Sequence, residues 1–147
     1  MKINGKLRYL WRAVDHEGEV LEAVVTAKRD KAAALKLLKR IMKTYGRPRT
    51  VVTDGLAAYS AAMNEIGNAD RQEVGPRFNN RAENSHQPFR RRERAMQRFR
   101  SMKALQKFSS IHTQVHNHFN QERHLVTRQV YKQRRWTALA EWRALAA

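Results

Sequence analysis

The sequence predicts one mixed α/β domain, in which a β-hairpin is followed by helices that alternate with short strands. Two observations indicate this class. β-Branched and aromatic residues cluster in two early runs, at residues 7–15 and 19–27, and apolar residues recur at helical spacing farther along the chain. Strands that alternate with helices after an antiparallel hairpin are typical of a mixed sheet flanked by helices. The length of 147 residues, without an internal repeat, suits a single domain.

The first elements are the hairpin and an amphipathic helix. A short polar turn that contains a glycine, at residues 16–18, joins the two strand-like runs. Asp30 has the position of an N-cap, and residues 32–45 carry apolar side chains on one helical stripe. Gly46 and Pro48 are expected to end this helix.

Shorter elements follow this helix. Residues 50–53 form an apolar run that is too short for a helix and suits a buried parallel strand. Residues 56–66 favour a second helix, and residues 71–74 favour a short strand. Pro88 lies near the start of the next helix, where a first turn tolerates proline or the helix kinks. We expect the three last helices at residues 82–100, 102–120 and 127–146.

The composition excludes several classes of protein. The chain has no cysteine, which excludes a disulfide scaffold and cysteine-ligated zinc or iron–sulfur centres. A hydrophobic content of 41% is too high for a disordered tail. No apolar run approaches the ~18 residues of a membrane span, and the N-terminal stretch lacks the apolar core of a signal peptide. We therefore expect a cytoplasmic protein without a membrane partner.

The chain is strongly basic, since 30 Lys and Arg residues against 13 Asp and Glu residues give a net charge of +17. Residues 77–107 alone carry ten basic and two acidic residues, a net charge of +8. Eight of the ten are arginines, whose planar guanidinium groups hold phosphate oxygens in pairs. A basic helix face that serves only solubility normally mixes both signs. The pattern favours a polyanionic partner, usually nucleic acid.

Two acidic residues have positions suited to chemistry. Asp54 directly follows the strand at residues 50–53, and open α/β sheets bind ligands beyond the carboxyl ends of their strands. Glu83 opens the arginine-rich helix and shares a helical face with His86 and Arg90. Carboxylates among phosphate-binding arginines suit metal-assisted phosphoryl transfer. The plainer alternatives are an N-cap role for Asp54 and a helix-dipole role for Glu83.

Several strings of the sequence carry a family resemblance. YLWRAVD at residues 9–15, VVTDGLAAY at residues 51–59 and NNRAENSHQPFRRRERAMQRFRS at residues 79–101 closely resemble the DDE transposases of bacterial insertion sequences. The string HNHFNQERHL at residues 116–125 is similar to the same family. The resemblance is nearest to the group that moves by forming cointegrates.

The resemblance implies a ribonuclease-H-like fold, that of the integrase catalytic core, over residues 1–125, with a helical tail at residues 126–147. Asp54 matches the second aspartate of the family and Glu83 its glutamate, which with a first aspartate hold two divalent ions, Mg²⁺ or Mn²⁺. The implied activity is that of a polynucleotidyl transferase, which cleaves and joins DNA strands at the ends of the element and in target DNA. A homo-oligomer on the bacterial nucleoid is implied as well. DNA contacts are expected from Asn80, Arg81, His86, Arg90, Arg91, Arg92, Arg94, Arg98 and Lys103.

The sequence departs from the family pattern in two respects. The strand that carries the first aspartate lies ahead of the text that residues 1–5 match, so we expect this strand to be partly or wholly missing and the copy to be weakly active or inactive. Asp15 falls in the hairpin turn and is not a substitute. The 28 residues between Asp54 and Glu83 are fewer than is typical of the family, which indicates a shortened loop. Unpaired backbone edges and marginal stability are further expectations.

Two other hypotheses remain open from the sequence. A basic nucleic-acid-binding module without catalysis explains the charge, although such a module has no use for acids near its basic face. His112, His116 and His118 have the helical spacing of a zinc site, but His112 also lies on an apolar stripe, which favours packing. Packing roles are likewise expected for Trp136 and Trp142 in the last helix.

Overall fold

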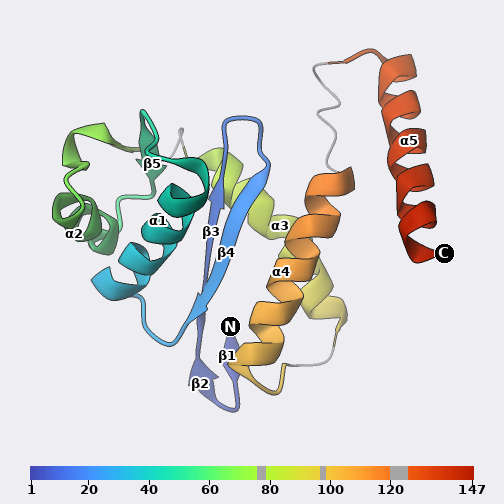
Figure 1. Ribbon diagram of the computed structural model, residues 1–147. Coiled ribbons are helices and arrows are strands. Elements are labelled where there is room, and N and C mark those ends of the chain that lie inside the picture. Colours follow the sequence, from blue (N-terminus) through green and yellow to red (C-terminus); the bar gives the residue numbers. More distant parts are fainter. Residues whose placement is uncertain (76–78, 97–98, 120–125) are drawn as a thin grey trace.

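The structure is a computed structural model that describes residues 1–75, 79–96, 99–119 and 126–147 (Figure 1). Arg98 and residues 120–125 of the last family-like string lie outside the described residues. The described elements are β1 (Lys2–Ile3), β2 (Lys6–Leu7), β3 (Tyr9–Val14), β4 (Val20–Thr26), α1 (Lys31–Tyr45), β5 (Val51–Thr53), α2 (Ala57–Glu65), the 3₁₀ turn η1 (Ala69–Arg71), β6 (Gln72–Val74), α3 (Asn80–Ala95), α4 (Met102–Phe119) and α5 (Arg128–Ala146).

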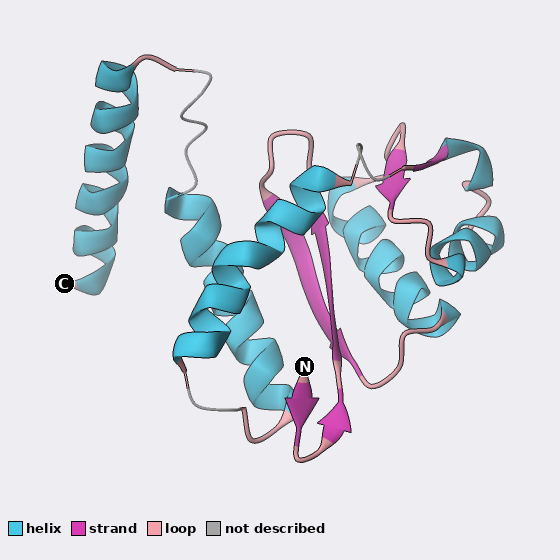
Figure 2. Ribbon diagram, turned by 180° about the vertical axis from the view of Figure 1, so that it is seen from behind, coloured by secondary structure: helices cyan, strands magenta, loops and turns pink. Residues whose placement is uncertain are grey.

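The long hairpin of β3 and β4 runs through the middle of the molecule (Figures 1 and 2). The two strands pair antiparallel, with a register that begins at Tyr9 opposite Thr26, as the sequence predicts. Asp15 closes the turn, because its Oδ1 accepts hydrogen bonds from the backbone N–H groups of Glu17 and Glu19, both at 2.9 Å. Asp15 is therefore a turn residue, as expected.

Helices cover both faces of this hairpin (Figure 1). On one face, Val24 packs with Leu37 of α1 and Met63 of α2. On the other face, Val25 packs with Phe89 of α3 and with residues of α4. Successive side chains of a strand point to opposite faces, so the adjacent valines enter two separate cores.

Helix α1 begins and ends where the sequence predicts. The Oδ1 atom of Asp30 accepts a hydrogen bond from Ala33 N at 3.0 Å, which makes Asp30 the N-cap. Gly46 adopts φ +80°, and its N–H donates to the carbonyl of Met42 at 2.9 Å. Glycine adopts such positive φ angles without the strain that a Cβ atom would bring.

The predicted single mixed sheet is not formed among the described residues. β3 pairs with β4, β5 pairs in parallel with β6, and β1 pairs with β2, which gives three separate two-stranded sheets. A cavity, rather than a shared ladder of hydrogen bonds, lies between β3 and β5. The mixed α/β class is correct, but the expected continuity of the sheet is wrong.

Helix α3 ends earlier than predicted. It stops at Ala95 rather than Arg100, because Met96 takes an extended conformation with ψ 157°. Helix α4 then starts anew, with the Oγ of Ser101 accepting a hydrogen bond from Ala104 N at 3.1 Å. Pro88 lies inside α3 rather than in its first turn, so the helix continues although one backbone donor is lost.

Helix α5 packs loosely against the end of α4. Ala138 is buried, and the ring of Trp142 lies 5.8 Å from that of Phe119. Trp136 is 67% exposed, so it does not pack against the described part of its own chain. No helix in the described parts of the chain has the length and apolarity that crossing a membrane requires.

Candidate active site

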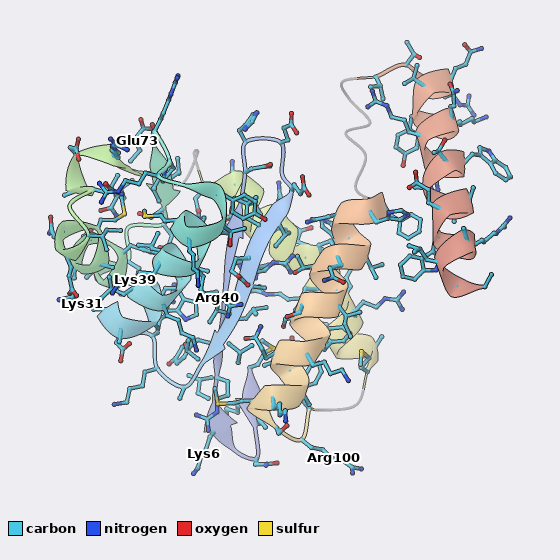
Figure 3. The ribbon with its side chains drawn as sticks, in the orientation of Figure 1. Lys6, Lys31, Lys39, Arg40, Glu73 and Arg100 are labelled. Atoms are coloured by element: carbon cyan, nitrogen blue, oxygen red, sulfur yellow. The ribbon has the colours of Figure 1, made fainter. Side chains whose placement is uncertain are left out.

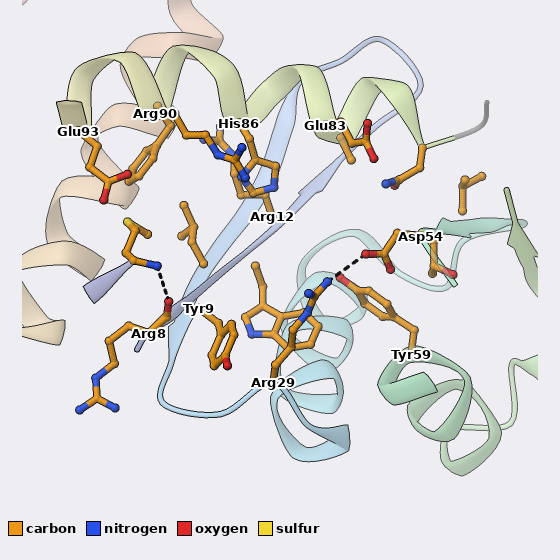
Figure 4. Close-up of a pocket in the computed structure, with 18 of the residues that line it drawn as sticks. Arg8, Tyr9, Arg12, Arg29, Asp54, Tyr59, Glu83, His86, Arg90 and Glu93 are labelled. Carbon is orange, nitrogen blue, oxygen red and sulfur yellow. Dashed lines mark hydrogen bonds and ion pairs between the residues drawn. The ribbon is translucent and has the colours of Figure 1, made fainter. Parts of the chain in front are cut away.

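A cavity of about 620 Å³ opens between β3, β5 and α3 (Figure 4). Both predicted carboxylates, Asp54 and Glu83, line it, although they come from separate elements. The other charged or titratable side chains in its wall are mostly basic: Arg8, Arg12, Arg29, His86, Arg90 and Arg94, with Tyr59 and Glu93.

Asp54 is held in a turn directly after β5. Its Oδ1 accepts a hydrogen bond from Leu56 N at 3.1 Å, and its Oδ2 lies 3.0 Å from Nη2 of Arg29. Gly55 follows with φ +82°, and a Cβ atom there would lie only 3.0 Å from Cγ1 of Val74. The N-cap position of α2 belongs to Leu56, so the alternative that Asp54 only caps that helix is wrong.

Glu83 lies in the first turn of α3, and its side chain is exposed. His86, Arg90 and Arg94 follow it along the same helix and line the same cavity, as the helical spacing predicts. Figure 4 shows Glu83 and Asp54 on facing walls of this cavity. The two acids thus line one cavity, Glu83 from α3 and Asp54 from the turn after β5.

Aromatic packing forms the wall beside Asp54. The ring of Tyr59 meets that of Trp11 edge to face, with centroids 5.3 Å apart. Burial raises the pKa of Tyr59 to about 12, and the negative charge of Asp54 adds to the rise. Tyr59 therefore stays protonated at neutral pH and keeps its hydroxyl hydrogen as a donor beside the carboxylate.

His86 is neutral at physiological pH. Burial, together with the positive charges of Arg12 and Arg90, lowers its pKa to about 4. A neutral imidazole carries one N–H donor and one acceptor. His86 can therefore meet a ligand as a hydrogen-bonding group, but it adds no positive charge.

The carboxylates fit one divalent ion better than two. Mg²⁺ is usually bound by one or two carboxylates, with waters and substrate phosphates completing six ligands. Asp54 and Glu83 supply such a pair. Within the described residues, no three His, Asp or Glu side chains form a metal-binding group, although Glu93 also lines the cavity.

The remaining predicted DNA contacts whose side chains the structure describes lie outside this cavity. Arg91 and Arg92 line a second groove, together with His112 and His116. Asn80 of α3 and Lys103 of α4 are exposed and line neither surface. The side chain of Arg81 lies outside the described part of the structure, like Arg98.

The histidines of α4 are packed rather than arranged around a metal. The ring of His112 lies 5.4 Å from that of Phe89 and stacks on that of His116 at 6.1 Å. His118 lies near the carbonyl of Ala138, 2.7 Å away. In the ranges that the structure describes, these histidines belong to no three-ligand group.

Basic side chains also project from several other elements. Figure 3 shows five such residues pointing outward, at positions distributed over the molecule: Lys6, Lys31, Lys39, Arg40 and Arg100. The excess of positive charge, +17 over the whole chain, attracts a polyanion at long range, while the cavity offers a defined place for it.

Sequence reasoning missed three arginines of the cavity wall: Arg8, Arg12 and Arg29. Arg12 lies in the middle of an otherwise apolar strand, and this interruption is the signal that could have identified it. Arg29 directly precedes the N-cap Asp30, and no local pattern links it to Asp54, 25 residues later. Its pairing with Asp54 depends on how α1 and β5 meet in three dimensions.

The profile of the family described as the DDE domain matches residues 1–122. The chain belongs to the DDE transposases of insertion sequences. The transposase for insertion sequence-like element IS431mec of Staphylococcus aureus is 38% identical over 66 residues, which cover 45% of this chain and 30% of that protein. The transposase for insertion sequence element IS257 in transposon Tn4003, also of S. aureus, has the same identity and coverage.

A third relative comes from another organism. The uncharacterized protein pYV0051 of Yersinia pseudotuberculosis is 33% identical over 69 residues, which cover 45% of this chain and 64% of that protein. No solved structure matches the chain. The DDE family is therefore established for the chain, whereas the ribonuclease-H-like fold stays a prediction. Each S. aureus match spans less than a third of the relative's length.

Proposed function

We propose that the chain acts on DNA phosphodiester bonds during transposition of an insertion sequence, with Asp54 and Glu83 as ligands of a divalent ion. The observation that carries this proposal is their position: two carboxylates from β5 and α3 line one cavity whose other charged groups are mostly arginines. DDE membership supports the same chemistry. Both acids match the family pattern, and both lie where a phosphate would be surrounded by positive charge.

In this proposal the two carboxylates bind the metal ion and the arginines bind the DNA backbone. A bound Mg²⁺ or Mn²⁺ would polarise a phosphoryl oxygen and lower the pKa of a bound water or 3′-hydroxyl. Asp54, fixed by its hydrogen bond from Leu56 N, and Glu83, on the rigid helix α3, present the oxygen ligands. Arg90 and Arg94 follow Glu83 on the same face and hold backbone phosphates beside the acids.

The DNA path extends beyond the cavity in this proposal. Arg91 and Arg92, on the neighbouring face of α3, contact the backbone on the side of the second groove. Phosphate contacts position DNA without reading its sequence. We therefore expect these arginines to hold the DNA backbone without recognising the sequence of the element ends.

Metal binding tests the proposal directly. Calorimetric titration of the full chain with Mn²⁺ should show binding that Asp54→Asn and Glu83→Gln each weaken by about tenfold or more, because each removes a charged oxygen ligand. Asp70→Asn, a matched change at an exposed acid of η1 outside the cavity, should leave the titration unchanged. Equal Mn²⁺ binding in all four chains would contradict the assignment of Asp54 and Glu83.

A non-catalytic nucleic-acid-binding module is the second candidate function. The ion pair between Arg29 and Asp54 favours it, because that pair neutralises the carboxylate without a metal. In such a module the acids only repel phosphate, so Asp54→Asn and Glu83→Gln would tighten DNA binding and Mg²⁺ would have no specific effect. In the metal-dependent function, Mg²⁺ strengthens DNA binding in the wild-type chain and not in these variants.

We also propose that the chain divides into residues 1–125 and a helical tail at residues 126–147, and that copies of it associate. Helix α5 carries large exposed apolar side chains, with Trp136 at 67% and Leu145 at 82% exposure. A second copy would cover them. Light scattering should show a mass above that of one chain, and Trp136→Ser with Leu145→Ser should return it to that of a monomer.

A further inference from the structure

Arg12 is a buried cation that has no anionic partner in the described part of the chain. It lies in β3, is 6% exposed, and its Nε and Nη2 atoms make no hydrogen bond within the part of the chain that the structure describes. Burial lowers the pKa of Arg12 to about 10, which leaves the guanidinium charged at neutral pH. Buried charges in proteins are normally paired, because an unpaired one costs several kcal/mol. This arginine therefore indicates a missing anion.

The surroundings of Arg12 are aromatic and basic. The guanidinium carbon lies 5.8 Å from the centroid of the Phe89 ring, and His86 and Arg90 lie beside it (Figure 4). In the described ranges no carboxylate forms an ion pair with Arg12, and Asp54 of the same cavity is already paired with Arg29. Glu83 and Glu93 line the same cavity, but neither forms an ion pair with Arg12, so the described residues leave this cluster without an anion.

The two unpartnered nitrogens define the shape of that anion. Nε and Nη2 lie on one edge of the guanidinium plane, so their N–H groups point in parallel. This is the fork that binds two oxygens of a phosphate at once. The wall of the cavity adds Arg90 and the neutral ring of His86, which supply a second positive charge and one more hydrogen-bonding group.

We propose that Arg12, with Arg90 and His86, binds a phosphate group, and that this group is a backbone phosphodiester of DNA. This inference rests on the proposed function, since it places one DNA phosphate in the cavity that Asp54 and Glu83 also line. Arg12 is a binding and positioning residue in this view: it fixes where the DNA backbone lies relative to the two acids.

Thermal unfolding of the full chain tests the phosphate site. The wild-type Tm should rise more in sodium phosphate than in sodium chloride of equal ionic strength, because an anion that binds only the folded chain stabilises it. Arg12→Met should unfold at a higher temperature than wild type in chloride, since it removes an unpaired buried charge. The same variant should lose the extra rise in phosphate.

Three outcomes of this measurement would overturn the proposal. The first is an equal phosphate response in wild type and Arg12→Met. The second is loss of that response in Arg49→Met, a matched change at an exposed arginine outside the cavity. The third is an equal rise in sodium acetate, which would assign the cluster to a carboxylate instead. If Arg12→Met fails to fold, the conservative Arg12→Lys should fold and bind phosphate more weakly, because lysine has no fork.

A second experiment tests whether the bound phosphate group belongs to DNA or is free phosphate. Anisotropy of a labelled short duplex, without divalent ions, should show about tenfold weaker binding for Arg12→Met and a change of less than about threefold for Arg49→Met. Equal losses of DNA affinity in the two variants would overturn the assignment to DNA.

Mn²⁺ titration of the wild-type chain reports on Asp54 and Glu83 alone. Mn²⁺ binding without a phosphate response contradicts this inference only, whereas the reverse result contradicts the proposed function only.

Discussion

Nη2 of Arg29 lies 3.0 Å from Oδ2 of Asp54, so a basic side chain occupies one oxygen of a proposed metal ligand. The two side chains are 49% and 37% exposed, and exposed ion pairs of this kind contribute only about 0.2–1 kcal/mol. The pair is therefore weak enough for a divalent ion to displace. Arg29 keeps Asp54 in place when no metal is bound and competes with the metal when one arrives.

Arg29→Gln is expected to tighten Mn²⁺ binding by about two- to fivefold, the range that corresponds to losing an exposed competing pair. Calorimetric titration of the full chain measures this change. Arg40→Gln is the matched control, since Arg40 pairs with Glu22 at 3.1 Å outside the cavity. Weaker Mn²⁺ binding in Arg29→Gln would show that Arg29 supports the site instead of competing in it.

Asn117 of α4 pairs with the backbone of Val20 at the outer edge of β4. Val20 N–H donates to Oδ1 at 2.9 Å, and Nδ2 donates to the carbonyl of Val20 at 2.8 Å. Gln106 makes the same kind of pair with Val25 N–H and the carbonyl of Ala23, both at 2.8 Å. These amides occupy an edge that would otherwise offer free donors and acceptors to another strand.

Asn117→Ala is expected to lower the free energy of unfolding by about 1–3 kcal/mol, because it leaves the buried N–H and carbonyl of Val20 without partners. Urea unfolding measures the change. Gln114→Ala, at an exposed position of the same helix, controls for helix propensity and should change stability by less than about 0.5 kcal/mol. Equal stabilities of the two variants would contradict the edge-pairing role of Asn117.

Local signals in the sequence were enough to predict many of the elements. The hairpin follows from strand-forming residues around a short turn, and α1 follows from the side chain of Asp30 and from Gly46, all within a few residues. The shared face of Glu83 and Arg90 follows from helical spacing alone. Residues close together in the sequence determine these features, so the sequence alone is enough to predict them.

Features that depend on distant segments could not be predicted in this way. Whether β3 and β5 share a ladder depends on what lies between them, and the hydrophobic pattern of either strand does not contain that information. The exposure of Trp136 depends on how far α5 reaches over α4. The burial of Arg12 beside Phe89 arises because α3 covers β3, although its place in an apolar strand was a usable sign.

Strand joining by this chain alone is expected to be weak or absent. Asp54 and Glu83 suit one divalent ion, whereas the family mechanism uses two, whose mutual repulsion calls for a bridging carboxylate. The measurement is incubation with Mg²⁺ or Mn²⁺ and a labelled oligonucleotide that carries the element end. Robust joining products, absent in Glu83→Gln, would show that a second ion is held by groups other than those described.

The stability of the chain is expected to fall as the pH is lowered from about 7 to 5. Burial, together with the positive charge of Arg12, lowers the pKa of His86 and of His112 to about 4. The unfolded chain binds protons at these histidines near the ordinary pKa of 6.5, whereas the folded chain does not. Between pH 6.5 and pH 4 the unfolded chain therefore holds more protons than the folded chain, and lowering the pH favours unfolding. The free energy of unfolding stops falling only below the pKa of about 4 that these histidines have in the folded chain.

Urea unfolding at several pH values between 7.5 and 5 tests whether the stability falls with pH and whether His86 and His112 cause the fall. The window stays above the range in which most carboxylates titrate. The double variant His86→Asn, His112→Asn should lose less stability over it than wild type, because two of the groups that take up protons on unfolding are gone, which leaves His116, whose pKa burial also lowers. His16→Asn, at a histidine whose side chain is 87% exposed, should follow the wild-type profile. A wild-type stability that rises toward pH 5 would mean that a bound anion or a carboxylate keeps these histidines protonated in the folded state, contrary to their burial beside Arg12.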